Sequence, residues 1–346
     1  MTATQKVQRP LELVHIRDYR PGDEDRLAEL AVTCFSDVGL GGTGAWLREW
    51  RWKFTGGYTG EYAPSVAQLK DGRIIGHYGS MIRLFKVGRD YHKVGVPIDN
   101  MIAPECRGGN IQRKLFAQQR RFAARIDVPF GLGIPNPSAY VVGRRLLRYK
   151  NLTWIKCFHA DLTMVRRLWR KWQWRHVPAC ADLAVHLVER VDDRFDELWE
   201  RLRKSYPCTE VRSSAFLRWR HEEAPDRDYE ILAAHGANGI EGYVVLRYPL
   251  ESDKSAEIVD LFAPPERPIL STLLRAALGH AAPRARGLDF RVAASEIFYR
   301  SLVENRIHWT GYELPVVYWR FSDKVNVRHF ENPQRWYITG SLADLV

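Results

Sequence analysis

Long apolar runs are missing from this sequence. No stretch approaches the roughly 18 consecutive apolar residues that cross a bilayer as a helix. Residues 1–20 also lack the apolar core that a signal peptide needs. The sequence therefore predicts a protein without a membrane span, with the cytoplasm as its compartment.

Metal-ligand and disulfide patterns are missing as well. The eleven histidines form no HxxxH pair, and the cysteines show no CxxC spacing. An odd number of cysteines in a chain without an export signal predicts reduced thiols, and we expect no bound metal. The five cysteines are Cys34, Cys106, Cys157, Cys180 and Cys208.

Low-complexity tracts are missing too, and the composition is that of a globular protein, with 45% hydrophobic and 27% charged residues. A chain of 346 residues is long enough for two domains, each with its own core. The net charge of +11 is uneven. Residues 1–165 carry +10 (25 Lys and Arg against 15 Asp and Glu), 166–180 carry +5, and 181–346 carry −4. The basic half favours an anionic partner such as a nucleotide cofactor, an acidic carrier protein or nucleic acid, the alternative being a solvated basic surface.

The first half of the chain predicts a defined order of elements. Turn residues and hydrophobic periodicity divide it into strands and helices. The order is a strand and helix in 14–35, a hairpin in 64–87 about Asp71-Gly72, a strand at 93–103, a helix at 109–125, a strand ending at Pro135, a helix at 138–149 and a strand pair in 152–165.

The second half repeats this order. Its elements are a helix at 192–204, a hairpin in 229–248 about Ala237-Asn238-Gly239, a strand at 255–263, a helix at 268–282, a strand at 288–294, a short helix and a strand at 312–321. Two local matches support an internal repeat over a chance recurrence of short strings. They are DNMIAPE at 99–105 with DLFAPPE at 260–266, and WLREWR at 46–51 with FLRWR at 216–220. We therefore divide the chain into domains at 1–165 and 191–346, joined by a basic and aromatic connector at 166–190.

The stretch from Ile98 to Phe116, IDNMIAPECRGGNIQRKLF, resembles the GNAT (GCN5-related N-acetyltransferase) superfamily, whose members typically show D-x-x-V-x-P-x-x-R-G-x-G-x-G there. A second matching stretch is GLGIPNPSAY at 131–140. The resemblance covers nearly all of 14–165 and, more loosely, 192–321. It implies an α/β (α+β) fold of two tandem GNAT-like domains, each a mixed, mostly antiparallel twisted sheet flanked by helices.

The resemblance also implies acetyl-CoA or another acyl-CoA as co-substrate. The pyrophosphate of coenzyme A needs convergent backbone N–H donors, which a glycine-bearing loop at a helix N-terminus provides. That loop would be Arg107, Gly108, Gly109, Asn110, Ile111 and Gln112. The preceding strand, with Asn100, Met101 and Ile102, would pair with the pantetheine arm as an added strand. The alternative is an ordinary glycine-rich turn before a helix.

Two positions depart from the family pattern, because Asn110 and Gln112 stand where glycines are usual. Asn tolerates a left-handed backbone, and the Gln112 side chain would have to point away from the phosphates. In the second copy, residues 264–271 (PPERPILS) contain no glycine, and Pro268 lacks an N–H. The second copy is thus predicted to be degenerate and not to bind cofactor.

Candidate catalytic residues follow from the family's roles. GNAT enzymes commonly use a carboxylate of the central strand as base, which corresponds to Asp99, and a Tyr of the later helix as acid. The usual position of that Tyr is Gly143 here, so Tyr140, one helical turn earlier, is the candidate, with Tyr149 as the fallback. Asn136 would bind pantetheine or the acceptor. A purely structural Asp99 is the alternative, favoured by Asp260 at the same offset in the degenerate copy.

The predicted function is direct transfer of an acyl group from acyl-CoA to the amine of a small acceptor, an amino sugar or an amino-acid-like molecule. The alternatives are transfer from acyl carrier protein, transfer from aminoacyl-tRNA, and a non-catalytic GNAT-like binding module. The retained Arg-Gly-Gly loop argues against a tRNA donor, so we do not expect nucleic acid as a partner. RRLWRKWQWR at 166–175 is interpreted as a helical connector whose tryptophans pack between the halves.

Overall fold

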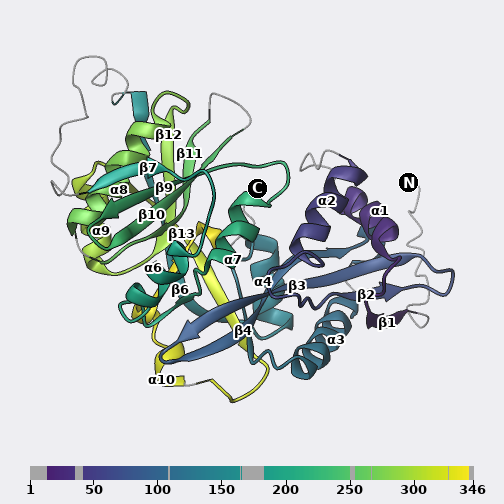
Figure 1. Cartoon of the computed structure of the whole chain (residues 1–346). Coiled ribbons are helices and arrows are strands. Elements are labelled where there is room, and N and C mark those ends of the chain that lie inside the picture. The colour runs from purple at the N-terminus through teal and green to yellow at the C-terminus, as the bar shows by residue number, and fades with distance from the viewer. Residues whose placement is uncertain are drawn as a thin grey trace. The chain divides into compact units, whose positions relative to one another are not determined.

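In the computed structural model the chain forms two compact units (Figure 1). The first unit comprises Met1–Ile82 and Gly95–Val128, and the second comprises Arg83–Val94 and Pro129–Val346. The structure describes residues 14–35, 42–107, 110–163, 165, 183–249, 254–265, 267–325 and 327–342. The predicted helix at 166–175 lies outside these described residues.

The first unit is built on four neighbouring strands in the order β1-β2-β3-β4. The strands are β1 (His15–Asp18), β2 (Ser65–Gln68), β3 (Ile74–Val87) and β4 (Asp90–Ile102), of which β3 and β4 continue into the second unit. The helices are α1 (Glu24–Cys34), α2 (Thr43–Lys53) and α3 (Ile111–Arg125). The strand order brings the central strand β4, and the turn that follows it, beside the long strand β3.

Helices cover both faces of these strands. Successive residues of a strand point to opposite faces, so Gly76 and His77 on β3 identify the two layers. A Cβ on Gly76 would lie 3.1 Å from Leu115 of α3, whereas the ring of His77 contacts Phe54, which directly follows α2. Thus α3 packs on one face, and α2, with its neighbour α1, covers the other (Figure 1).

A core of aromatic side chains holds α2 in place. Trp46 and Trp50 are buried one helical turn apart, and the ring of Trp50 lies 5.1 Å from Tyr19 and 5.0 Å from Phe54. In the sequence, residues 46–51 are interpreted only as one half of a repeat signature with 216–220. In the structure they lie within α2. Removing a fully buried aromatic such as Trp50 costs about 3–5 kcal/mol.

The second unit contains a longer sheet with the strand order β5-β13-β6-β12-β11-β10-β9-β7. Its strands are β5 (Phe130–Gly133), β6 (Lys150–Asp161), β7 (Ala184–Leu187), β8 (Cys208–Glu210), β9 (Asp228–Gly236), β10 (Gly239–Tyr248), β11 (Ala256–Phe262), β12 (Gly287–Ala293), β13 (His308–Arg320) and β14 (Trp336–Thr339). Its helices include α4 (Pro137–Leu146), α6 (Arg194–Leu202), α7 (Ser214–Leu217), α8 (Arg267–Ala281), α9 (Glu296–Glu304) and α10 (Val327–Phe330). Both α6 and α8 pack against β10, and α9 packs against α8.

Strand β13, near the end of the chain, lies between β5 and β6. It pairs antiparallel with both, with Val317 opposite Gly133 and Leu314 opposite Ile155. On its other edge β6 pairs with β12, where Phe158 lies opposite Phe290. The expected strand pair in 152–165 is therefore wrong. A single strand, β6, occupies this region, and its partners come from the far end of the chain.

The mixed α/β fold class is confirmed, and so are the two predicted hairpins. Gly72 and Gly239 occupy the turns with φ of +90° each, a conformation that glycine adopts without strain. The strands β11 and β12 are parallel and joined by α8, the arrangement that a strand–helix–strand crossover produces. The division of the chain into domains at 1–165 and 191–346, with a connector at 166–190, stays a prediction. None of the helices in the described part of the chain is long and apolar enough to span a membrane.

Candidate functional site

Asp99, the candidate base, occupies an unusual backbone position near the end of β4. Its φ is +52°, in the left-handed region that Asp and Asn enter more readily than most residues. The carboxylate is largely buried, with 11% of the side chain exposed, and its Oδ1 lies 3.4 Å from Nζ of Lys53. The strand thus bends at a carboxylate that is balanced by a lysine.

Lys53 is the residue of this site that the sequence reasoning missed. Its side chain is 6% exposed, and its Nζ lies 3.1 Å from Oε1 of Glu49, one turn earlier on α2. One ammonium therefore sits beside two carboxylates, Glu49 and Asp99. The only signal in the sequence is the Glu-to-Lys spacing of i, i+4, which is common on exposed helices and does not reveal a buried site.

His77 supports Asp99 through the backbone. Its Nδ1–H donates to the carbonyl oxygen of Asp99 at 2.7 Å, and the residue is fully buried. Burial lowers the pKa of His77 to about 4, although the hydrogen bond to Asp99 acts in the opposite direction. The imidazole is therefore neutral near pH 7. Among the described residues, its Nε2 has no hydrogen-bond partner.

The turn after β4 leads directly into α3. The N–H of Ala103 donates to the carbonyl of Ile75 at 2.9 Å, a short 3-10 turn spans Pro104–Cys106, and Nε of exposed Arg107 donates to the carbonyl of Ile102 at 3.2 Å. Gly108 and Gly109, the predicted centre of the phosphate loop, lie outside the described residues. The guanidinium is thus tied to the end of the strand on which Asp99 lies.

Asn110 precedes α3 as its N-cap residue. Its φ is −84°, so the tolerance of Asn for a left-handed backbone is not used, and its side chain makes no cap hydrogen bond. Ile111 is buried against Gly76, and Gln112 is half-buried. The first N–H groups of α3 therefore receive no side-chain acceptor from the N-cap residue. The N-terminus of a helix suits an anion, and the binding of phosphate at this one stays a prediction.

The strand residues predicted to pair with pantetheine differ in exposure. Asn100 is exposed, Met101 is buried and Ile102 is half-buried. All three belong to β4 in the first unit, together with Asp99 and the turn to α3. Within the described residues no group of His, Cys, Asp or Glu side chains could hold a metal ion.

Asn136 and Tyr140 belong to the second unit. Oδ1 of Asn136 accepts from the N–H of Ala139 at 2.8 Å, so this side chain caps α4. The hydroxyl of Tyr140 donates to Oδ1 of Asn151 on β6 at 3.0 Å. Both assignments made from the sequence, Asn136 to cofactor or acceptor and Tyr140 to proton donation, stay predictions.

Tyr149 is a packing residue, and it explains why position 143 is glycine. Helix α4 ends at Leu146 rather than extending to Tyr149, and the Tyr149 ring stacks on Trp319 with 4.4 Å between centroids. A Cβ on Gly143 would lie 2.2 Å from the Tyr149 ring. A tyrosine could not replace Gly143 without displacing this stack.

Asp260, which the predicted repeat pairs with Asp99, is completely buried. It accepts from Arg212 at 3.0 Å, from the hydroxyl of Thr339 at 2.7 Å and from Tyr243 at 2.8 Å. Burial alone would raise its pKa, but the charge and hydrogen bonds of Arg212 outweigh burial, and the pKa lies below its usual range. Such a fully bonded carboxylate has a structural role.

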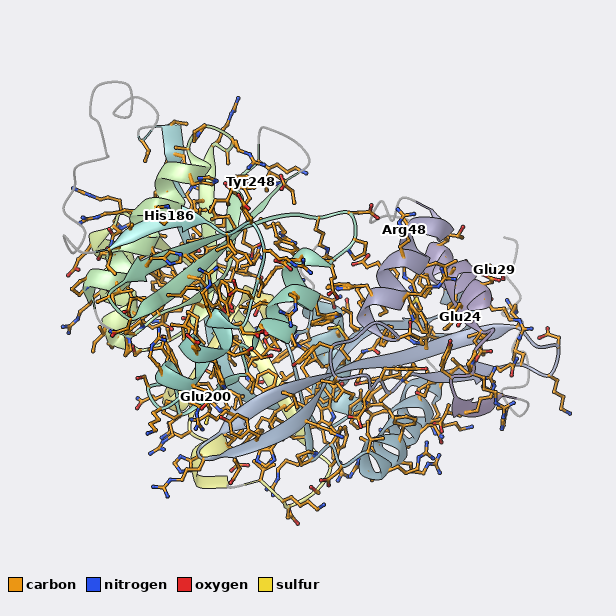
Figure 2. All side chains as sticks on the ribbon, viewed as in Figure 1. Glu24, Glu29, Arg48, His186, Glu200 and Tyr248 are labelled. Atoms are coloured by element: carbon orange, nitrogen blue, oxygen red, sulfur yellow. The ribbon has the colours of Figure 1, made fainter. Side chains whose placement is uncertain are left out.

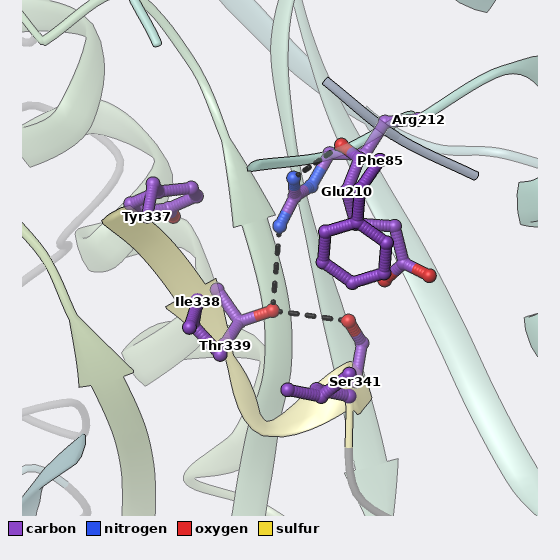
Figure 3. A pocket seen from close by; sticks show the side chains of 8 residues that line it. Phe85, Glu210, Arg212, Tyr337, Ile338, Thr339 and Ser341 are labelled. Carbon is purple, nitrogen blue, oxygen red and sulfur yellow. Dashed lines mark hydrogen bonds between the residues drawn. The ribbon is translucent and has the colours of Figure 1, made fainter. Parts of the chain in front are cut away.

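The surroundings of Arg212 leave no room for a substrate. Figure 3 shows a hydrogen-bonded chain from Arg212 to Thr339 and on to Ser341, with distances of 3.5 and 3.1 Å. The adjoining cavity has a volume of about 10 Å³, enough for one water molecule. This polar cluster stabilises the second unit internally and is not a ligand site.

Comparison with known proteins identifies the fold. No known family model matches this sequence, and no curated protein matches it. A conserved protein of unknown function from Enterococcus faecalis V583, a probable N-acyltransferase, matches with a TM-score of 0.66 and 11% identity, over 88% of this chain and 72% of that one.

Two further solved structures are similar. The GCN5-related N-acetyltransferase from Kribbella flavida has a TM-score of 0.65 and 15% identity, over 88% of this chain and 70% of that one. The GCN5-related N-acetyltransferase from Anabaena variabilis ATCC 29413 has a TM-score of 0.65 and 12% identity, over 89% and 73%. The chain therefore has the fold of GCN5-related N-acetyltransferases, as the sequence predicted, and at this identity the likeness establishes the fold alone.

Proposed function

We propose that this chain is an N-acyltransferase that moves an acyl group from acyl-CoA to the amine of a small acceptor. The proposal rests on the fold together with the turn between β4 and α3. There Arg107 and the uncapped start of α3 follow a strand that ends in exposed Asn100, buried Met101 and half-buried Ile102. That combination suits a pyrophosphate joined to an extended, amide-bearing arm.

The cofactor residues in this proposal are those of the first unit. The N–H groups of residues 108–112 would bind the pyrophosphate, Arg107 would add positive charge, and the backbone of Asn100–Ile102 would pair with pantetheine. Asn136 lies in the second unit, and its assignment stays a separate prediction from the sequence. The second half would bind no cofactor, since its 264–271 stretch lacks glycine and its Asp260 is fully used in structure.

The proposed reaction is a direct transfer. The acceptor nitrogen attacks the thioester carbonyl, a C–N bond forms and the C–S bond breaks. Asp99 would take the proton that the nitrogen loses, and Tyr140 would give one to the departing thiolate. Lys53 and His77 would act through Asp99, the former by balancing its charge and the latter by fixing its backbone.

Calorimetric titration with coenzyme A and with pantetheine tests the proposal. Pantetheine has the same amide-bearing arm but no pyrophosphate. We expect coenzyme A to bind at least about tenfold more tightly, because only it engages the N-terminus of α3 and Arg107. Equal affinity for the two ligands would show that the turn does not bind phosphate, and no binding of either would exclude the proposed cofactor.

A second candidate donor, acyl carrier protein, is favoured by the charge of α3. This helix contains five basic residues and no acidic residue, and all five basic side chains are exposed. Acidic partners are attracted to such a surface. Comparing acyl-CoA with acyl carrier protein as donor, in the natural chain and in Arg113→Glu with Arg120→Glu, separates the two. Loss of transfer from the carrier alone would support the second candidate. The five residues are Arg113, Lys114, Arg120, Arg121 and Arg125.

A further inference from the structure

A groove of about 290 Å³ lies in the first unit, where β1 ends and α3 ends. None of its lining residues belongs to the predicted cofactor or catalytic set. Three aromatic residues line it, Tyr19, Tyr62 and Phe122, and two acidic ones, Asp18 and Glu61. The remaining lining residues are two prolines, a glycine and an isoleucine. The volume is that of a site for a small molecule.

The aromatic walls are fixed in position. The rings of Tyr19 and Tyr62 meet edge to face, with 5.9 Å between centroids, and Trp50 packs behind Tyr19. The hydroxyl of Tyr19 donates to Glu24, and burial is the main cause that raises the pKa of this phenol. The Tyr19 ring is therefore held in place, and a cation could be attracted to its face.

The charges on the groove are of one sign. Its charged lining residues, Asp18 and Glu61, are both carboxylates, and no Lys or Arg lines it. At its rim the guanidinium of Arg125 pairs with Asp18 and lies 4.8 Å from the centroid of Phe122. Both carboxylate oxygens of Asp18 are therefore bonded, one to Arg125 and the other to Nε2 of Gln118 at 2.7 Å, and a ligand would have to contact the remaining aromatic walls and Glu61.

We propose that this groove binds a small organic cation, a quaternary or protonated amine about the size of choline. Aromatic faces attract such a cation, and the two carboxylates that line the groove outnumber the one guanidinium at its rim, that of Arg125. The site is independent of the proposed acyl transfer, because neither the turn before α3 nor Asp99 contributes to it.

Ligand-observed NMR on the full chain tests the charge requirement. The two probes are choline and 3,3-dimethylbutan-1-ol, which has the same shape but carries no charge. We expect choline to bind about tenfold more tightly than the neutral alcohol. Equal binding of the two, or no binding of choline, would overturn the proposal, whatever the result with coenzyme A.

Variants test the position of the site. Glu61→Gln removes one groove carboxylate with almost no change in shape, and we expect it to weaken choline binding about fivefold. Glu29→Gln is the matched control, since Glu29 is exposed on α1 and does not line the groove (Figure 2). A second variant, Tyr62→Leu, should weaken binding to a similar extent. Unchanged affinity in folded Glu61→Gln and Tyr62→Leu, or an equal loss in Glu29→Gln, would place the cation elsewhere.

Discussion

His77 and Asp99 are joined by a hydrogen bond of 2.7 Å from an imidazole N–H to a backbone carbonyl. This bond connects β3 to the one residue of β4 whose φ is positive. A strained residue in a strand persists only when its surroundings hold it, and His77 supplies one such constraint. Lys53 holds the side chain of the same residue from α2. Backbone and carboxylate of Asp99 are therefore positioned by two different elements.

The depressed pKa of His77 makes stability depend on pH. With a pKa of about 4 in the folded protein and about 6.5 when unfolded, the unfolded chain binds more protons between these values. The stability that the neutral His77 contributes is therefore fully present above about pH 6.5, and it declines as the pH falls toward 4. We expect the free energy of unfolding to decrease when the pH is lowered from 7 to 5. The decrease should be about 2 kcal/mol smaller in His77→Gln than in the natural chain.

Urea unfolding at the two pH values measures this difference. Gln provides a side-chain N–H donor but does not titrate. His159→Gln is the control, because His159 is about half exposed and pairs with Asp289 at the surface. The same pH dependence in His77→Gln and the natural chain would contradict the buried neutral imidazole.

A double-mutant cycle tests the pair formed by Lys53 and Asp99. We expect Lys53→Met and Asp99→Asn to show a coupling free energy of about 2 kcal/mol, because both side chains are largely buried and each loses a close opposite charge when the other is replaced, although Glu49 still pairs with Lys53. The matched cycle uses Arg73 and Glu105, an ion pair of 2.8 Å with side chains 46% and 54% exposed. Exposed pairs contribute about 0–1 kcal/mol. Equal couplings in the two cycles would show that burial at Asp99 has no energetic consequence.

Local signals in the sequence predicted the elements well. Asp71-Gly72 and the glycine of Ala237-Asn238-Gly239 form the hairpin turns, because a positive φ at a turn strongly selects glycine. The resemblance of Ile98–Phe116 to GNAT sequences likewise predicted the strand–turn–helix from β4 to α3. Such features depend on residues close in the chain, which is why one sequence is sufficient to find them.

Long-range features were not predictable in this way. The insertion of β13 between β5 and β6 joins residues about 150 to 190 positions apart, and no local pattern specifies that partner. Helix α2, whose buried side chains include Trp46, Trp50 and Lys53, was noted in the sequence only as one half of a repeat signature. Only the structure, in which Lys53 lies beside Asp99, assigns Lys53 to this candidate site. The same holds for the stack of Tyr149 on Trp319 that makes position 143 a glycine.

Asp260 is expected to serve stability. Asp260→Asn would leave the buried guanidinium of Arg212 without its counter-charge, and we expect the free energy of unfolding to fall by about 3 kcal/mol. Asp289→Asn, at a half-exposed ion pair of the same unit, should cost less than about 1 kcal/mol. Chemical denaturation of the natural chain and the two variants measures both changes in the free energy of unfolding. A stable Asp260→Asn that loses activity would instead assign Asp260 a role in catalysis.

Arg107 is expected to contribute to cofactor binding. Arg107→Ala should weaken the binding of coenzyme A about tenfold, since a charge-assisted contact with phosphate is lost, and leave pantetheine unaffected. Gly109→Glu, which introduces a carboxylate into the same loop, should abolish coenzyme A binding. Arg26→Ala on α1 is the control for loss of one exposed positive charge. Calorimetry on folded variants measures all three, and an unchanged affinity in Gly109→Glu would exclude this loop as the phosphate site.

Tyr140 and Tyr149 allow a matched test of the proposed acid. Tyr140→Phe removes a hydroxyl that is hydrogen-bonded to Asn151, and we expect turnover to fall about 100-fold, the scale of a positioned acid, with cofactor affinity nearly unchanged. Tyr149→Phe keeps the ring that stacks on Trp319, so turnover should remain close to that of the natural chain. Steady-state kinetics with acetyl-CoA and an amine acceptor, together with calorimetry, separate turnover from binding. If the loss in Tyr140→Phe appears wholly in cofactor affinity, Tyr140 binds the cofactor and does not donate the proton. If Tyr149→Phe shows the larger loss of turnover, the acid is Tyr149, and its stacking on Trp319 would then be what positions it.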